Sequence, residues 1–557
     1  MADETTAAEV LGQMSLFNGL SEDQLAQIAD GVPTLVLAKD EIIYEQGGDA
    51  DTFYIILSGR VHLSQASRQV ERSLGLLEEA DYFGQEALER EKPRQATARA
   101  ATDIVLLVFG SELIEELIGQ YPVLKNRIKI ITDSFEFFLR LDFPWLSPRE
   151  TIYYIGRRSP LYLVPRLILP ALILLLVVPL WIYLYASLQM MLFFYLTLVT
   201  ALLTVGLVAW NVFDWGNDYS IITNRRVLFQ EKIVLIYDSR QEVPLDAVLA
   251  DDVTTSQVGR WFDYGDLIIR TYTGAITLPG ITMPAEVKIL LDNRRQRANI
   301  RRERTKRQTI RSTIRQHLGY DEENEENQPE DLSAQPVTPT IHTGTLPNAL
   351  SNLFMLRSEV NGVITYRTHW FILLGKTFLP TLLLFLTLFV LIARLVNLFT
   401  LLSIPSVVLL SILLLIIFGL WYLYQYVDWR NDRYIITDRE LIDVFKRPLG
   451  VEQKRTAPLE NILSIDYERP NLIHLILNFG TVYIRIGEAS LTFNNVFNPA
   501  DVQREIFERF LNKKLQKQQQ NDDAEQRRMA DWIEIYHQEV TGRDQDENSP
   551  DEEEENE

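Results

Sequence analysis

The chain has 557 residues and contains no cysteine, which excludes disulfides, thiolate metal sites and cysteine nucleophiles. Its length indicates several domains, because a single hydrophobic core rarely grows beyond about 250–300 residues. With 75 Asp and Glu against 54 Lys and Arg, the net charge of −21 argues against a nucleic-acid partner for the chain as a whole.

The first segment, residues 10–140, is soluble in composition and alternates strand-like runs with amphipathic helices. Ser21 is a good N-cap for a short helix, and Ser111–Leu141 is expected to be helical. Between them, strands are expected at Thr34–Leu37, Glu41–Tyr44, Thr52–Ser58, Arg60–Gln65 and Ile104–Phe109. The sequence therefore predicts a small β-barrel or jelly roll with flanking helices.

A candidate anion site lies in the two stretches Phe83–Leu88 and Pro93–Ala98. A glycine that opens a helical turn presents free N–H groups to an anion, and an arginine nearby can close on it with two hydrogen bonds. These stretches resemble the phosphate-binding cassette of the cyclic nucleotide-binding domain. Phe17, the turn Tyr44–Gly47 and the strand Phe53–Gly59 extend the resemblance over most of the segment.

The resemblance implies that Arg94 pairs with the cyclic phosphate of cAMP or cGMP. It also implies that the backbone N–H groups of Gln95 and Ala96 complete the anion site, while Gly84 allows close approach. The candidate ligand contacts are therefore Gly84, Gln85, Glu86, Ala87, Arg94, Gln95, Ala96 and Thr97.

Two residues depart from the pattern of this family. The family usually has a glutamate at the position of Gln85, where it accepts a hydrogen bond from the ribose 2′-hydroxyl. Gln85 can accept through its amide oxygen, but without the assistance of a charge. Glu86 stands where the family usually has an apolar residue, and it brings a charge close to the pocket. A domain of this fold that no longer binds nucleotide is therefore an open alternative.

Four long apolar segments follow, in two pairs: Leu161–Leu188, Met190–Val212, Trp370–Ala393 and Leu398–Val427. Each supplies the roughly 20 apolar residues that cross a bilayer as a helix, whereas buried core helices are usually shorter and keep a polar side. The short turns carry at most Arg394, and the opposite ends carry Arg157, Arg158, Arg166, Arg225, Arg226, Arg367, Lys376, Arg430 and Arg433. By the positive-inside rule, both termini are cytoplasmic in a multi-pass protein of the cell membrane. Ionisable residues are almost absent inside the spans, which argues against a channel or pump.

An internal repeat follows each pair of spans. Asp214–Arg225 and Asp428–Arg439 share the pattern Asp-Trp-x-Asn-Asp-x-x-Ile-Ile-Thr-x-Arg, and each is followed by short alternating strands. A helix is expected after Pro284 in the first copy and after Pro499 in the second. The two regions resemble the bacterial pleckstrin-homology (PH-like) domains found after transmembrane hairpins, which implies two small β-barrels, each closed by a helix, that act in interaction or assembly.

Arg225 and Arg226 are candidates to face anionic lipid headgroups, because Trp215 just before them is expected at the membrane interface. The alternative is that these charges only set the topology. The basic stretch Arg294–Arg315 likewise either binds anionic lipid or forms a solvated helix.

The predicted order is a cyclic nucleotide-binding-like domain (1–142), a transmembrane hairpin (143–215), a PH-like domain (216–295), a linker (296–350), a second hairpin (351–429), a second PH-like domain (430–512) and a charged tail (513–557). The expected fold class is thus a multidomain α+β membrane protein.

No nucleotide-loop, hydrolase or metalloprotease motif occurs, and the six histidines are scattered, so neither catalysis nor a metal or cofactor is expected. We expect a membrane-anchored cyclic nucleotide receptor that relays ligand occupancy to the PH-like units and to a membrane partner or a second copy. The alternative is a structural membrane scaffold whose N-terminal domain does not bind nucleotide.

Overall fold

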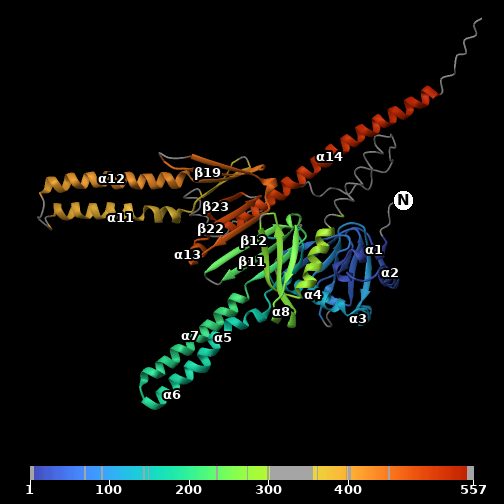
Figure 1. Ribbon diagram of the computed structural model, residues 1–557, viewed down its shortest axis with the longest axis horizontal. Helices are drawn as coiled ribbons and strands as arrows, with labels where there is room; N and C mark the ends of the chain where they lie inside the picture. Colours follow the sequence, from blue (N-terminus) through green and yellow to red (C-terminus); the bar gives the residue numbers. More distant parts are fainter. Residues whose placement is uncertain are drawn as a thin grey trace, which may run out of the picture. The chain divides into compact units, whose positions relative to one another are not determined.

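The computed structural model describes residues 6–67, 70–88, 92–141, 143, 145–147, 150–233, 236–272, 274–297, 300, 356–360, 362–396, 398, 403–448, 452–487 and 489–547. The chain is a mixed α+β multidomain protein (Figure 1). One compact unit comprises Met1–Arg295 and Met355–Phe507, and a second contains most of the long C-terminal helix α14 (Pro499–Glu547). Most of the basic stretch and the linker lie outside the described residues.

The N-terminal domain consists of two four-stranded antiparallel sheets with flanking helices. Its elements are α1 (Ala7–Gly12), α2 (Glu22–Gly31), β1 (Thr34–Leu37), β2 (Ile42–Tyr44), β3 (Thr52–Ser58), β4 (Val61–Ser67), β5 (Val70–Leu77), β6 (Tyr82–Phe83), β7 (Thr97–Ala100), β8 (Ile104–Gly110), α3 (Ser111–Gln120) and α4 (Val123–Arg140). One sheet has the order β1-β8-β3-β6 and the other β2-β7-β4-β5. Ser21 caps α2, as predicted, and accepts a hydrogen bond from the backbone N–H of Gln24.

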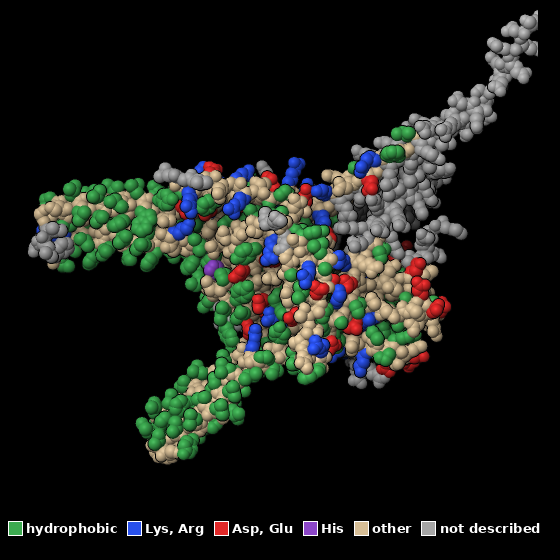
Figure 2. Space-filling view, in the orientation of Figure 1, with side chains coloured by type: hydrophobic (Ala, Val, Ile, Leu, Met, Phe, Trp, Pro, Cys, Tyr) green, Lys and Arg blue, Asp and Glu red, His purple; other side chains and the backbone are tan. Residues whose placement is uncertain are grey.

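Four helices are long and apolar enough to cross a membrane, which confirms the predicted spans. The first span is Val164–Leu188, built from α5 (Val164–Leu172), a π-helical turn at Ile173–Val177 and α6 (Val178–Leu188). The others are α7 (Met191–Trp215), α11 (Trp370–Leu395) and α12 (Ile404–Asn431). Hydrophobic side chains cover both hairpins, while charged side chains gather over the sheets (Figure 2).

The base of each hairpin is closed by the same two contacts. Arg166 Nη1 lies 2.7 Å from Asp214 Oδ2 in the first hairpin, and Lys376 Nζ lies 2.8 Å from Asp428 Oδ2 in the second. The tryptophan after each aspartate donates its indole N–H to a backbone carbonyl before the first helix of its hairpin: Trp215 to Arg158, and Trp429 to Thr368, both at 2.9 Å. The repeated Asp-Trp pair therefore ties the two helices of each hairpin together.

Each hairpin is inserted between two neighbouring strands of a sheet. β9 (Ile152–Arg157) precedes the first hairpin and pairs antiparallel with β10 (Tyr219–Thr223), which follows it. β17 (Val363–Arg367) pairs in the same way with β18 (Arg433–Ile436) around the second hairpin. Residues 152–157 and 363–367 lie within the predicted hairpin segments, 143–215 and 351–429, where no strand is predicted from the sequence.

The two repeats share one seven-stranded sheet, of order β23-β22-β21-β12-β11-β10-β9. β11 (Arg226–Ile233) and β12 (Tyr237–Pro244) come from the first copy, and β21 (Ser464–Arg469), β22 (Phe479–Ile486) and β23 (Ala489–Phe497) come from the second. A three-stranded sheet contains β13 (Ala250–Thr254), β14 (Tyr264–Thr271) and β15 (Gly274–Thr282). A five-stranded sheet adds β16 (Arg357–Val360), β19 (Glu440–Lys446) and β20 (Glu452–Pro458) to β17 and β18.

These sheets do not close into the predicted barrels. The edge of β12 pairs with β21 of the other copy, with Asp238 opposite Arg469 and Glu242 opposite Ile465. The predicted helices are present, over 284–297 in the first copy and as α14 in the second. The pairing across copies is what makes the sheet continuous and open.

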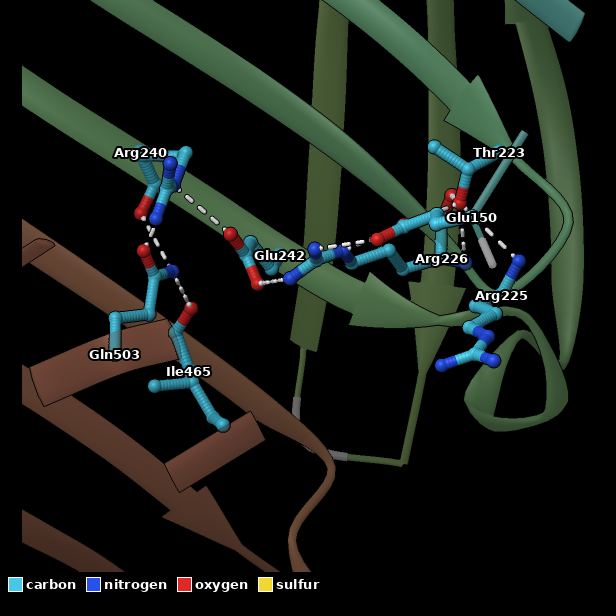
Figure 3. Close-up of polar contacts among 8 residues, drawn as sticks. All are labelled: Glu150, Thr223, Arg225, Arg226, Arg240, Glu242, Ile465 and Gln503. Atoms are coloured by element: carbon cyan, nitrogen blue, oxygen red, sulfur yellow. Dashed lines mark hydrogen bonds and ion pairs between the residues drawn. The ribbon is translucent and has the colours of Figure 1, made fainter. Parts of the chain in front are cut away.

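A row of buried charges lies beside this junction (Figure 3). Arg226 is 1% exposed and holds the Glu150 carboxylate with two hydrogen bonds, from Nε at 2.8 Å and Nη2 at 2.7 Å. Its Nη1 lies 2.7 Å from Glu242, whose other oxygen lies 2.8 Å from Arg240 Nε. Gln503 of α14 accepts from Arg240 and donates to the carbonyl of Ile465, which connects the row to the second copy.

The prediction that Arg226 faces lipid is therefore wrong. Its position at the start of β11 points the side chain into the core, between Glu150 and the ring of Phe507 at 4.1 Å. Burial alone would raise the pKa of Glu150, but the charge and hydrogen bonds of Arg226 outweigh burial and lower it. Arg225 is only partly buried, and its contact with lipid stays a prediction.

We predict that Arg226→Met destabilises the folded chain by about 3–5 kcal/mol, because Glu150 would stay buried without its cation and Glu242 would keep only Arg240. Thermal unfolding of the detergent-purified full chain measures the effect. The control is Arg270→Met, which removes an exposed pair with Asp252 and should cost about 1 kcal/mol or less. Equal losses for the two variants would contradict the role of the buried row.

Candidate anion-binding site

The candidate site begins at Gly84, directly after β6. Its φ of +77° lies in the left-handed region, and a Cβ there would meet Arg94 Nη1 at 2.8 Å and the carbonyl of Thr52 at 3.0 Å. A 3₁₀ turn, Gln85–Leu88, follows and is closed by the N–H of Ala87 donating to the carbonyl of Gly84. Only glycine fits this close approach without strain.

Arg94 is buried at the centre of the site, with 2% of its surface exposed. Its Nη2 donates to the carbonyl and hydroxyl oxygens of Thr52, at 2.7 and 2.9 Å, and its Nη1 donates to the carbonyl of Gly84 at 3.2 Å. The guanidinium lies over the ring of Tyr44, 4.1 Å from its centroid. The side chain is thus fixed in place by β3 and two aromatic rings, the second being Tyr54.

The carboxylate of Glu86 lies beside two of the groups that the resemblance assigns to phosphate binding, the N–H of Gln95 and the guanidinium of Arg94. Its Oε1 accepts from the backbone N–H of Gln95 at 2.9 Å, and its Oε2 lies 3.9 Å from Arg94 Nη1. Burial raises the pKa of Glu86, and the N–H of Gln95 and the charge of Arg94 offset this only in part. An anion of this chain therefore sits between the backbone donor and the guanidinium.

Three buried polar atoms of this site have no hydrogen-bond partner among the described residues: Gln85 Oε1, Glu86 Oε2 and Arg94 Nε. Buried polar atoms are normally satisfied, so a cluster of unsatisfied ones marks a place where a polar ligand fits. A small cavity beside them is lined by Gln85, Glu86, Lys92, Gln95, Thr132, Phe135 and Glu136. The last three residues belong to α4, which covers the site.

The structure brings together most of the predicted contacts. Gly84, Gln85, Glu86, Arg94 and Gln95 converge, whereas Ala87 and Ala96 are buried and support the turn. Thr97 begins β7 and accepts a hydrogen bond from the backbone of Gln46. Thr52 and the residues of α4 are not predicted from the sequence as part of the site, since nothing in the local pattern shows which distant elements cover the cassette.

The cassette is joined to the first PH-like region by buried contacts. Asp81, three residues before Gly84, lies 2.6 Å from Arg294 Nη1 and accepts from the hydroxyl of Tyr153 at 3.0 Å. Arg127 of α4 lies 2.7 Å from Glu286 of the helix over 284–297. Residues of both domains also share one hydrophobic core, with Phe83 and Ala98 on one side and Ile155, Ile221 and Leu228 on the other.

The comparisons with known families agree with this geometry. The family described as cyclic nucleotide-binding domain matches residues 34–121, and the bacterial PH domain matches residues 163–290 and 381–513. The chain contains a cyclic nucleotide-binding domain and two bacterial PH domains. Both PH matches include apolar helix as well as sheet, in accord with hairpins inserted between paired strands.

The similar curated proteins share only the N-terminal domain. A cGMP-dependent protein kinase, isozyme 2, of Drosophila melanogaster is 31% identical over 124 residues, which are 22% of this chain and 13% of the kinase. A cAMP-dependent protein kinase regulatory subunit of Debaryomyces hansenii is 30% identical over 20% of this chain and 24% of that protein. This chain therefore spans less than a quarter of either relative.

Among solved structures, the catabolite activator protein of Thermus thermophilus is similar, with 26% identity over 22% of this chain and 58% of that one. Its TM-score is 0.21, which supports no further inference. The curated relatives show that the cyclic nucleotide-binding domain of this chain is distantly related to kinase regulatory domains.

We predict that Gly84→Ala destabilises the folded chain by about 1–2 kcal/mol, because alanine is strained at positive φ and its Cβ would press on Arg94. Thermal unfolding of the full chain measures this. Gly119→Ala is the matched control: Gly119 lies on the exposed side of α3 with no atom near its Cβ position, so that change should be neutral or stabilising. Equal melting temperatures for the two variants would refute the packing argument.

Proposed function

We propose that this protein is a membrane-anchored receptor for a cyclic nucleotide, cAMP or cGMP, and that it passes ligand occupancy to its PH domains. The observation that carries the proposal is that the Gln95 N–H and the Arg94 guanidinium both lie beside the buried carboxylate of Glu86, next to a cavity that Gln85, with its unsatisfied Oε1, also lines. A cyclic phosphate suits the two donors, and the amide oxygen of Gln85 suits a ribose hydroxyl. The domain's family and its kinase relatives support the same ligand class.

In this proposal the phosphate binds by displacing Glu86. The carboxylate and the phosphate compete for the same N–H and the same guanidinium, so they cannot occupy the site together. Glu86 lines the cavity with Thr132, Phe135 and Glu136 of α4. Moving its charge toward Glu136 is unfavourable, and α4 is therefore the element whose position the ligand changes.

In this proposal, the change in α4 reaches the first PH domain by two routes: through α4 itself and through Asp81 in the turn between β5 and β6. Arg127 links α4 to Glu286, and Arg294 links the helix over 284–297 to Asp81 beside the cassette. A ligand that favours one arrangement of α4 shifts the population of these contacts. The output is binding or assembly at the membrane, without catalysis.

We further propose that the hairpins cross the cell membrane with both termini in the cytoplasm. The four apolar helices and the basic residues at the sheet-facing ends of the hairpins support this orientation. Arg158 and Arg166, for example, lie at the base of the first hairpin, paired with Asp218 and Asp214.

The decisive test is calorimetric titration of the full chain in detergent with cAMP and with cGMP. Arg94→Ala should weaken binding about 10- to 100-fold, since charge-assisted hydrogen bonds contribute about 1.5–3 kcal/mol. Arg99→Ala, which removes an exposed arginine of β7, should bind as the wild type does. A melting curve for each variant separates lost binding from lost folding.

A second prediction concerns Glu86. Glu86→Gln should bind nucleotide about tenfold more tightly than wild type at pH 7.5, because it removes the competing charge. Since burial raises the pKa of Glu86, wild-type affinity should rise as the pH falls from 7.5 and Glu86 takes up a proton, while the variant stays flat. The other charged groups at the site, among the described residues, are Arg94, Asp51 beside it, Lys92 and Glu136, and Glu136→Gln is the control for a general loss of charge.

A structural scaffold is the second candidate, and Glu86 is the observation that favours it. Its carboxylate already accepts from Gln95, so the cassette can be stable without ligand. This candidate predicts no heat of binding at millimolar nucleotide for either the wild type or Glu86→Gln. That outcome would overturn the receptor proposal.

A further inference from the structure

Two short helices hold the same place in the two repeats. α8 (Gln257–Trp261) lies directly before β14, and α13 (Leu472–Ile476) lies directly before β22 (Figure 1). Each helix is followed by a residue in the left-handed region, Asp263 and Asn478, both with φ of +51°. The shared backbone course shows that α8 and α13 are the same element of the duplicated unit.

Both helices expose large apolar side chains at matching positions. Val258 and Trp261 of α8 are 46% and 72% exposed, and their counterparts Ile473 and Ile476 of α13 are 47% and 71% exposed. Single exposed apolar residues are common and need no explanation. Here the two copies have otherwise different sequences in this helix, yet both keep two apolar side chains exposed to the same degree.

Each short helix precedes a strand whose first residue lies beside the entry to a hairpin, although that strand and the strands that flank the hairpin belong to different sheets. In the first copy, the ring of Tyr264 at the start of β14 lies 6.3 Å from the ring of Tyr162, two residues before the first span. The N–H of Ser159 also donates to the carbonyl of Gly280 at 2.7 Å, which ties the approach to this hairpin to β15.

The second copy repeats this arrangement. The ring of Phe479 at the start of β22 stacks on His369, 4.5 Å between centroids, and His369 directly precedes α11. His474 of α13 lies 4.1 Å from the same phenylalanine ring. In both copies, therefore, the short helix adjoins the point where the chain enters its first apolar helix.

We propose that α8 and α13 insert their exposed apolar side chains into the headgroup region of the bilayer that the adjoining hairpin crosses. The proposal rests on the hairpins being membrane spans. Trp261 lies between Arg260 and Phe262, which is 58% exposed, and tryptophan with a neighbouring base is typical of an interface. Each PH domain would thus be held against the membrane by its short helix as well as by its hairpin.

The difference between the two helices favours lipid over a protein partner. Protein interfaces require complementary shapes at their cores, and tryptophan and isoleucine differ strongly in shape and volume. A fluid membrane interface requires only apolar area near the surface. The side chains of Trp261 and Ile476 are both apolar but differ in shape, and contact with lipid permits this difference.

The absence of cysteine allows a direct test. Single-cysteine variants Trp261→Cys and Ile476→Cys of the full chain are labelled with an environment-sensitive fluorophore and reconstituted in phosphatidylcholine vesicles. The matched control is Tyr272→Cys, which is 73% exposed and follows the opposite end of β14, about 25 Å from α8. Leu202→Cys in α7 reports whether the first hairpin is inserted.

Lipids brominated near the headgroup should quench the labels at positions 261 and 476 at least threefold more than the label at position 272. Quenching equal to that at position 272 would overturn the proposal. Shielding from aqueous iodide without quenching by lipid would also overturn it, because a second copy or another protein would then cover the helices. If chain-brominated lipids fail to quench position 202, the membrane assignment of the hairpin fails, and the proposal fails with it.

Discussion

The bidentate ion pair between Arg226 and Glu150 is the interaction on which the arrangement of the domains depends. Glu150 directly precedes Thr151 and β9, and Arg226 opens β11, so the pair holds the strand before the first hairpin to a strand after it. Glu242 and Arg240 extend the row to the edge of β12, where the second copy joins. A shift in the register of these strands would leave at least one charged side chain buried without a partner. The free-energy cost of an unpaired buried charge is much larger than the stabilisation that the ion pair provides. We infer that the row specifies one pairing of the two repeats.

The domain that holds the candidate ligand site packs against the region that carries the first hairpin. Among the described residues, two ion pairs and a shared apolar core hold the N-terminal domain to the first PH domain. The ion pairs are Asp81 with Arg294 and Arg127 with Glu286. Protein interiors deform little, so a displacement of α4 would move these packed contacts together. A change at Glu86 is therefore felt beyond its own domain in the receptor that we propose.

The sequence was sufficient for the features that depend on local pattern. Gly84 and Arg94 were recognisable from the resemblance to a phosphate-binding cassette, the four spans from their length and composition, and the duplication from the repeated Asp-Trp motif. Features that depend on distant partners were not predictable. The strands β9 and β17 are short and adjoin apolar spans, so their pairing partners lie beyond a whole hairpin. Arg225 and Arg226 are adjacent at the start of β11, and the sequence does not tell which of the two points into the core. The carboxylate of Glu86 could be expected near the pocket. Its contact with Gln95 depends on how the 3₁₀ turn lies against the segment just before β7, which the local sequence does not show.

The insertion of each hairpin between paired strands has a consequence for how such a protein can arise. β9 and β10 are antiparallel neighbours, so the ends of the first hairpin are separated by little more than the spacing of two strands, about 5 Å. In topological terms, each apolar hairpin takes the place of the turn that would connect two antiparallel strands. A tight turn of a few residues could close the same gap without changing any strand of the sheet, since insertions at turns are the changes that folds tolerate best. The apolar hairpin is thus separable from the fold of the PH domain, and a form of the domain without the hairpin would differ at one connection.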